Sequence, residues 1–199
     1  MTKMTSNEFA EKALLAVFLI ISLLITSCRS LRQQSEELSP VYMTNRKKVF
    51  LLSPALISNQ IDKVQHLEGH FGNQNFSLII LFIADEKQIE LTLLNAFGSD
   101  MGRLFYDGKD VVFESGVFPP GLKGEYIICD IQNAFYKPES LIENYTKAGL
   151  VFEETKEDDK TVRIIKDNKK VIEKIILSSH EVSIDNQLRG YSYRLTDEN

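Results

Sequence analysis

The hydrophobic pattern of this chain changes its period near the middle, and this change limits the folds open to it. In the first half, short stretches alternate polar and apolar residues or run apolar as β-strands do, and turn sequences separate them. Asp107-Gly108 is a dipeptide typical of tight hairpins. The stretches predict an antiparallel meander over residues 62–71, 76–84, 88–97, 102–106 and 110–114.

The period then becomes helical. From Gly124 to Tyr136 apolar residues recur every three or four positions, which predicts one buried helix face. Pro138 opens a second helical stretch, and Gly149 is placed to end it. Strand patterns return at 150–155, 161–166, 170–177 and 190–196.

Strands and helices do not alternate along the chain, which argues against a parallel α/β sheet. A long antiparallel sheet curls, and helices laid on its concave side supply the missing core. We therefore predict a mainly β (α+β) fold, in which a curled antiparallel sheet forms an unclosed barrel with the helices packed in its concave side.

The amino-terminal segment has the features of an export signal. Ala13 to Ile25 is almost wholly apolar, and as a helix it would span roughly 20 Å, short of the roughly 30 Å hydrocarbon core. Ile25-Thr26-Ser27-Cys28 resembles the bacterial lipobox, in which the cysteine receives a lipid. We predict a signal peptide over 1–27, a lipidated tether over 28–46 and one domain over 47–199. The alternative is an uncleaved anchor followed by a chance cysteine.

Composition and motifs exclude several classes of function. The net charge of −5 offers no basic surplus for nucleic acid. His66 and His70 would lie about 13 Å apart on a strand, too far to share a metal ion. With Cys28 lipidated, Cys129 has no partner and is expected to be buried. We find no catalytic motif and expect no metal or cofactor.

Several stretches of the mature chain resemble one family of bacterial lipoproteins of unknown function, often found with aryl-polyene biosynthetic clusters. The stretches are LTLLNAFGSDMGRLFY at 91–106, FPPGL at 118–122, CDIQNAFYKPESL at 129–141, GLVFEE at 149–154 and RGYSYRL at 189–195. Members of that family look like the lipoprotein-localisation proteins LolA and LolB. The resemblance implies an unclosed barrel with an apolar cavity for acyl chains, and it implies no catalytic residue.

We therefore expect an outer-membrane lipoprotein that faces the periplasm, binds an acyl, polyene or lipoprotein lipid chain, and helps deliver it to the membrane. Arg29, rather than Asp, follows Cys28, which by resemblance favours the outer membrane. The expected partners are the membrane, the lipid ligand and a periplasmic LolA-like carrier or exporter. The expected cavity residues are Leu91, Leu93, Phe97 and Phe105 on strands, Ile128, Ile131 and Phe135 on the helix, and Val117 and Phe118 in the Pro/Gly-rich loop.

Two alternatives remain open at this point. The barrel could be filled solid, with Phe118 plugging the core, and the protein could then be an assembly lipoprotein that docks a biosynthetic or export partner. An enzyme that acts on acyl substrates is the third hypothesis. A continuous apolar void would favour binding, whereas normal packing density would favour docking.

Overall fold

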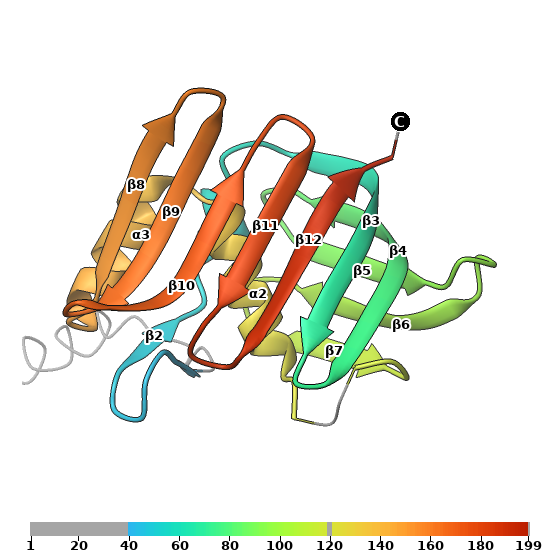
Figure 1. Ribbon diagram of the computed structural model, residues 1–199, viewed down its shortest axis with the longest axis horizontal. Coiled ribbons are helices and arrows are strands. Elements are labelled where there is room, and N and C mark those ends of the chain that lie inside the picture. Colours follow the sequence, from blue (N-terminus) through green and yellow to red (C-terminus); the bar gives the residue numbers. More distant parts are fainter. Residues whose placement is uncertain (1–39, 119–120, 199) are drawn as a thin grey trace, which may run out of the picture. The chain divides into compact units, whose positions relative to one another are not determined.

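A computed structural model describes residues 40–118 and 121–198 of the chain (Figure 1). Its main feature is one antiparallel sheet with the strand order β7-β6-β5-β4-β3-β12-β11-β10-β9-β8. Within the described residues β7 and β8 form the two edges, so the sheet is not closed into a barrel. The strands are β3 Ile61–Phe71, β4 Gln74–Ala84, β5 Ile89–Leu94, β6 Asp100–Tyr106, β7 Val111–Ser115, β8 Val151–Glu157, β9 Lys160–Asp167, β10 Lys170–Leu177, β11 Glu181–Asn186 and β12 Tyr191–Asp197.

Neighbouring strands follow one another in sequence except at the centre of the sheet, where β3 pairs with β12. Two meanders, β3–β7 and β8–β12, are joined by this pairing. Tight turns connect the strands of the second meander. Asp158 and Asn168 have positive φ values of 53° and 54°, as a two-residue hairpin turn requires.

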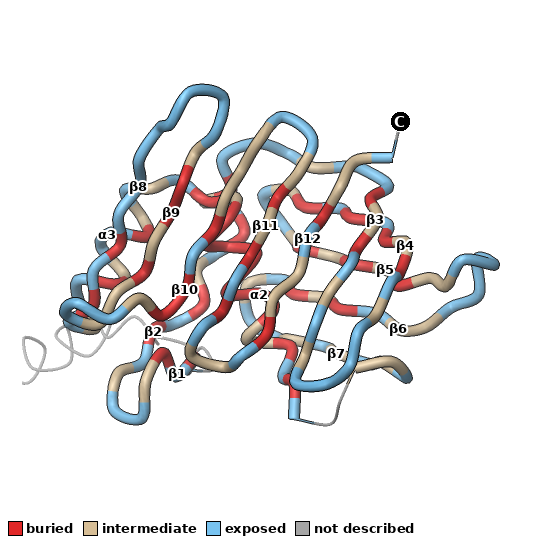
Figure 2. The backbone as a smooth tube through the Cα atoms, in the orientation of Figure 1, coloured by how far each residue is buried: buried red, intermediate tan, exposed pale blue. Residues whose placement is uncertain are grey.

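The two helices α2 (Gly124–Phe135) and α3 (Pro138–Lys147) carry the chain from edge strand β7 to edge strand β8. They lie on the inner side of the sheet, where buried residues concentrate (Figure 2). Strand β4 shows the alternation that builds this core, because Leu78, Ile80 and Phe82 are buried while the residues between them face outward. The prediction of a mainly β, antiparallel and unclosed fold with two helices is confirmed.

A second, two-stranded sheet pairs β1 (Pro40–Tyr42) with β2 (Lys48–Phe50), and a short 3-10 helix, η1 (Pro54–Leu56), follows it. Val41 and Val49 are buried in this hairpin, and the Gln132 side chain of α2 bonds both the N–H and the carbonyl of Leu52. The segment expected to be a tether as far as Arg46 is therefore folded from Pro40 onward. The predicted signal peptide lies outside the described residues.

Candidate functional site

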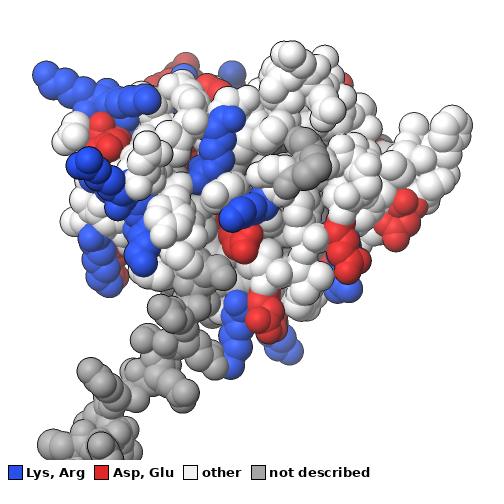
Figure 3. Space-filling view, turned by 90° about the horizontal axis from the view of Figure 1, so that it is seen from below, with Lys and Arg blue, Asp and Glu red and all other residues white. Residues whose placement is uncertain are grey.

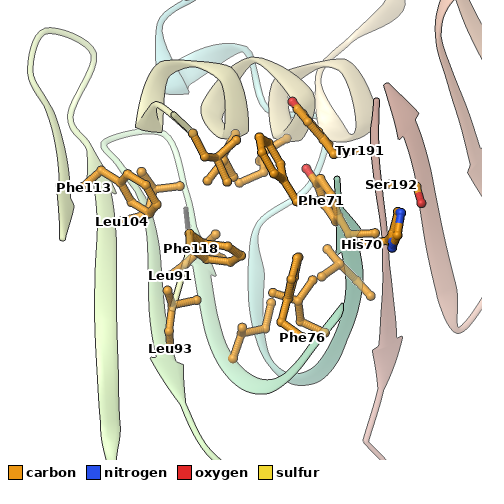
Figure 4. Close-up of a pocket in the computed structure, with 17 residues that line it drawn as sticks. His70, Phe71, Phe76, Leu91, Leu93, Leu104, Phe113, Phe118, Tyr191 and Ser192 are labelled. Carbon is orange, nitrogen blue, oxygen red and sulfur yellow. The ribbon is translucent and has the colours of Figure 1, made fainter. Parts of the chain in front are cut away.

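An apolar cavity lies between the inner face of the sheet and helix α2 (Figure 4). It has a volume of about 40 Å³. Side chains from β3 to β7, from the segment between β7 and α2, from α2 and from β12 line it, and most of them are apolar. They are Leu67, His70, Phe71, Phe76, Ile80, Leu91, Leu93, Leu104, Phe113, Phe118, Leu122, Ile127, Ile131, Tyr191, Ser192, Tyr193 and Leu195.

Helix α2 begins close to the sheet because residue 124 is glycine. A Cβ atom there would lie 2.7 Å from Phe113 Cβ and 2.8 Å from Val111 Cγ1. The backbone can therefore approach β7 and β6 directly. This approach places Ile127 and Ile131, one turn apart, over the cavity.

Three partly exposed phenylalanines form one wall of the cavity. The Phe118 ring meets the Phe76 ring edge-on at a centroid distance of 4.8 Å and lies 5.9 Å from the Phe113 ring. In Figure 4 the Phe118 ring stands between Leu91 and Phe76. Phe118 therefore fills space that the sheet and α2 would otherwise enclose.

Tyr191 and Tyr193 connect the cavity to a buried polar cluster. Their rings line the cavity and stack at 6.3 Å, while Tyr191 also stacks on Phe71 at 5.8 Å. The Tyr191 hydroxyl donates to Asp130 Oδ2 at 2.6 Å, and the Tyr193 hydroxyl contacts the same oxygen at 3.4 Å. The cavity surface is thus apolar although two tyrosines contribute to it.

Two buried carboxyl groups, Asp130 on α2 and Glu173 on β10, form the centre of this cluster. Burial raises the pKa of both groups, and the negative charge of the nearby Asp130 carboxylate raises the pKa of Glu173 further. Asn133 Nδ2 donates to Glu173 Oε1 at 3.2 Å, whereas Glu173 Oε2 has no hydrogen-bond partner among the described residues. Two carboxyls in this setting retain a proton between them at pH values where an exposed pair would be ionised.

A β-bulge explains how Glu173 comes to face inward. The pairing register between β10 and β9 shifts between Val171 and Glu173, and the consecutive residues Ile172 and Glu173 are both buried. The hydrophobic pattern of the strand alone would place only one of them inside.

Four of the predicted cavity residues, Leu91, Leu93, Phe118 and Ile131, line the cavity. Ile128 is fully buried but does not line it, and Phe135 instead packs edge-on against Phe82 at 5.5 Å. Val117 packs on the core outside the lining. On the helix, positions 127 and 131 face the cavity, and 128 and 135 lie on the neighbouring face.

Two predicted residues lie away from the cavity. Strand β5 ends at Leu94 because Asn95 Oδ1 accepts bonds from the N–H groups of Phe97 and Ser99, so Phe97 stands in a loop and is 93% exposed. Phe105 alternates with the buried Leu104 and Tyr106 and so faces the outer side of the sheet. The expectation that Phe97 and Phe105 line the cavity is wrong for these reasons.

The predicted cavity residues include no lining residue of β3 or β12, and they also lack Phe76, Ile80, Leu104, Phe113, Leu122 and Ile127. The alternation in β3 places Leu67 and Phe71 inside, and period-two counting from Leu67 could have found Phe71. Nothing in the sequence indicates that β12 would pair with β3 and bring Tyr191 and Tyr193 to the same cavity.

The remaining sequence predictions concern cysteine, histidine and the membrane. Cys28 lies outside the described residues, and Cys129 is free and buried, as expected. His66 and His70 bond Ser77 and Asn75 respectively, and within residues 40–118 and 121–198 no group of His, Cys, Asp and Glu suits a metal ion. In the same part of the chain, no helix has the length and apolar character needed to cross a membrane.

The model of a family described as a protein of unknown function (DUF3261) matches residues 62–198, which run from β3 to β12 and exclude the β1–β2 hairpin. No curated protein matches the chain.

Proposed function

This chain belongs to the DUF3261 family, and we propose that it binds the hydrocarbon part of a lipid, an acyl or polyene chain, between its sheet and helix α2. In this proposal Cys28 carries a lipid that anchors the protein at the periplasmic face of the outer membrane, where the bound chain is delivered. A LolA-like fold, a periplasmic LolA-like carrier and an aryl-polyene product are parts of the same proposal.

The apolar lining of the cavity is the observation that carries this proposal. Its polar groups are few, and the Tyr191 hydroxyl is engaged by Asp130. Moving hydrocarbon out of water contributes about 25 cal/mol per Å² whether it enters a bilayer or such a cavity. A chain could therefore pass between the two with little net change in free energy.

The volume of the cavity sets a condition on binding. Ligand pockets commonly measure about 300–1,000 Å³, whereas this cavity measures about 40 Å³. A ligand chain must displace side chains, and the partly exposed Phe118 ring is the one best placed to leave. We therefore propose that Phe118 occupies the site until a hydrocarbon chain replaces it.

The same small volume favours a second candidate function. A core filled by its own side chains fits an assembly lipoprotein that docks a biosynthetic or export partner through its outer surface. Asp130 and Glu173 lie behind the cavity wall, so we propose no catalytic role for them.

A binding titration separates the two candidates. The probe is a fatty acid with a conjugated tetraene, which fluoresces when it leaves water. Phe118→Ala is expected to strengthen probe binding several-fold because it removes the internal competitor, and Leu93→Trp is expected to weaken it by filling the cavity. Phe97→Ala, which changes an exposed phenylalanine outside the cavity, is the matched control and should leave binding unchanged. If neither the wild-type protein nor Phe118→Ala binds the probe, lipid binding is excluded and the docking function stands.

A further inference from the structure

The β1–β2 hairpin presents an unusual outer face. Val41 and Val49 point into the core, so the alternate residues Tyr42, Lys48 and Phe50 point outward. Tyr42 is 49% exposed and Phe50 is 39% exposed. Two aromatic side chains thus stand on the surface of the first described element of the chain.

This face is basic in a protein that is acidic overall. From Pro40 to Ile61 the sequence contains Arg46, Lys47 and Lys48 and no Asp or Glu, while the whole chain has a net charge of −5. Arg46 and Lys48 are exposed, and Lys48 Nζ lies 5.3 Å from the centre of the Phe50 ring. Lys47 forms an ion pair with Asp167 at 2.7 Å and so ties the hairpin to the β9–β10 turn.

Neighbouring elements extend the same surface. Asn144 Nδ2 of α3 donates to the Phe50 carbonyl at 2.9 Å, and Ile142 on that helix is 47% exposed. The Arg189 guanidinium donates to the Tyr42 carbonyl and lies 3.7 Å from the centre of the Tyr126 ring. Lys169 and Lys170 are exposed at the β9–β10 turn. Figure 3 shows many Lys and Arg side chains on this side of the molecule, with Asp and Glu side chains among them.

We propose that the outer face of the β1–β2 hairpin rests on the membrane surface, with Arg46 and Lys48 against lipid phosphates and Tyr42 and Phe50 in the interfacial layer. Aromatic and basic side chains together are the combination that favours this layer. The inference rests on the proposed lipidation of Cys28.

The length of chain before the hairpin supports the membrane surface as the partner of this face. Cys28 precedes Pro40 by 12 residues, which reach at most about 40 Å when fully extended. A lipid on Cys28 would thus keep the hairpin close to the headgroups, and the effective concentration of the surface would be high. The hairpin also lies outside the residues that the family model matches.

The test uses the full lipidated chain in vesicles of phosphatidylethanolamine and anionic phosphatidylglycerol. An environment-sensitive dye is attached through Tyr42→Cys, since Cys129 is buried and Cys28 would be acylated. The control dye is attached through Asp159→Cys in the β8–β9 turn, which lies at the other end of strand β9 from the Asp167 that Lys47 binds (Figure 1). The dye at position 42 is expected to shift to the blue and to be quenched by nitroxide-labelled lipid, and the dye at 159 to do neither.

Charge variants and vesicle flotation complete the test. Arg46→Gln and Lys48→Gln should each reduce the lipid-dependent shift of the dye emission. Loss of one positive charge near an anionic surface lowers the binding constant for that surface roughly fivefold. Equal emission at 42 and 159 in protein that floats with vesicles would overturn the inference and leave the anchor intact. Protein that does not float would refute the anchor and the inference together. If the dye emission at position 42 instead shifts with rising protein concentration in the absence of lipid, the face binds a second copy of the chain, and the inference is overturned.

Discussion

Gly69 of β3 lies directly opposite Phe76 of β4, and the Phe76 ring covers the position that a side chain at residue 69 would occupy. The Phe76 ring can occupy this position at the cavity wall only because Gly69 has no Cβ. The packing of Phe76 therefore requires glycine at residue 69. This contact also supports the edge-on packing of Phe76 against Phe118.

Gly69→Ala is expected to displace the Phe76 ring and to lower the free energy of unfolding by about 1–3 kcal/mol, the usual cost of overpacking. Urea unfolding followed by circular dichroism measures it. Gly116→Ala is the matched control, because a Cβ there would contact no atom within 4 Å. Equal stability of the two variants would contradict the matched packing of Gly69 and Phe76.

The buried carboxyl pair predicts how stability varies with pH. Burial raises the pKa of Asp130 and of Glu173 in the folded protein, so the folded state binds more protons than the unfolded state from about pH 4 up to the raised values. Stability contributed by these protons is present at low pH and is lost as pH rises through that window, by up to about 1.4 kcal/mol per pH unit for each proton.

Glu173→Gln should flatten this dependence, because an amide keeps the shape of the protonated acid and does not titrate. The variant should be more stable than wild type at pH 8, and urea unfolding across pH 5–8 measures the difference. Glu153→Gln, at an exposed carboxyl, provides the control. A slope unchanged by Glu173→Gln would show that the pair is not the source of the pH dependence.

Arg163 is predicted to contribute far more to the free energy of unfolding than Lys166, which forms a more exposed ion pair from the same strand. Its Nη1 donates to the carbonyls of Asn133 and Ala134 at 2.8 Å each, and its Nε bonds Glu154 at 2.8 Å, with the side chain only 8% exposed. Arg163→Gln removes the cation that binds these carbonyls at the end of α2 and should cost about 3 kcal/mol. Thermal unfolding gives the comparison.

The control for Arg163 is Lys166→Gln, which breaks the more exposed Lys166–Glu153 pair between the same two strands, β9 and β8. An exposed pair is worth about 0–1 kcal/mol. The predicted result is a much larger loss of unfolding free energy in Arg163→Gln than in Lys166→Gln. Losses of similar size would disprove the buried role of Arg163.

The proposed anchor is tested by feeding producing cells an alkyne analogue of palmitate. Wild-type protein should incorporate the label, and Cys28→Ser should abolish it. Cys129→Ser should retain it, because that thiol is buried and unpaired in the folded domain. Labelling of Cys28→Ser would place the lipid elsewhere and remove the anchor from the proposal.

The strands and helices could be predicted largely from the sequence, because each strand buries one face and so alternates in composition. The predicted meander over 62–114 matches β3–β7. Strand β11 was missed because Val182 and Ile184 are its only apolar residues, and β1 and β2 were missed because each is three residues long.

The candidate site was only partly predictable, and the errors have specific causes. A shift of one residue moves a strand side chain to the opposite face, as Leu104 and Phe105 show. The Asn95 turn ended β5 before Phe97 could join it. The Asp130–Glu173 pair joins a helix to a distant strand, and no local pattern reports such a long-range contact.

The pairing of β3 with β12 has a consequence for how the protein can be made. Strand β3 cannot complete its pairing until β12, which follows both helices in the sequence, is also free to fold, so the two meanders join late and through contacts between distant residues. The cavity wall, which includes Tyr191 and Tyr193, comes into being at that last step. The proposed hydrocarbon site would therefore exist only once both meanders have folded together, and a chain with one folded meander would lack it.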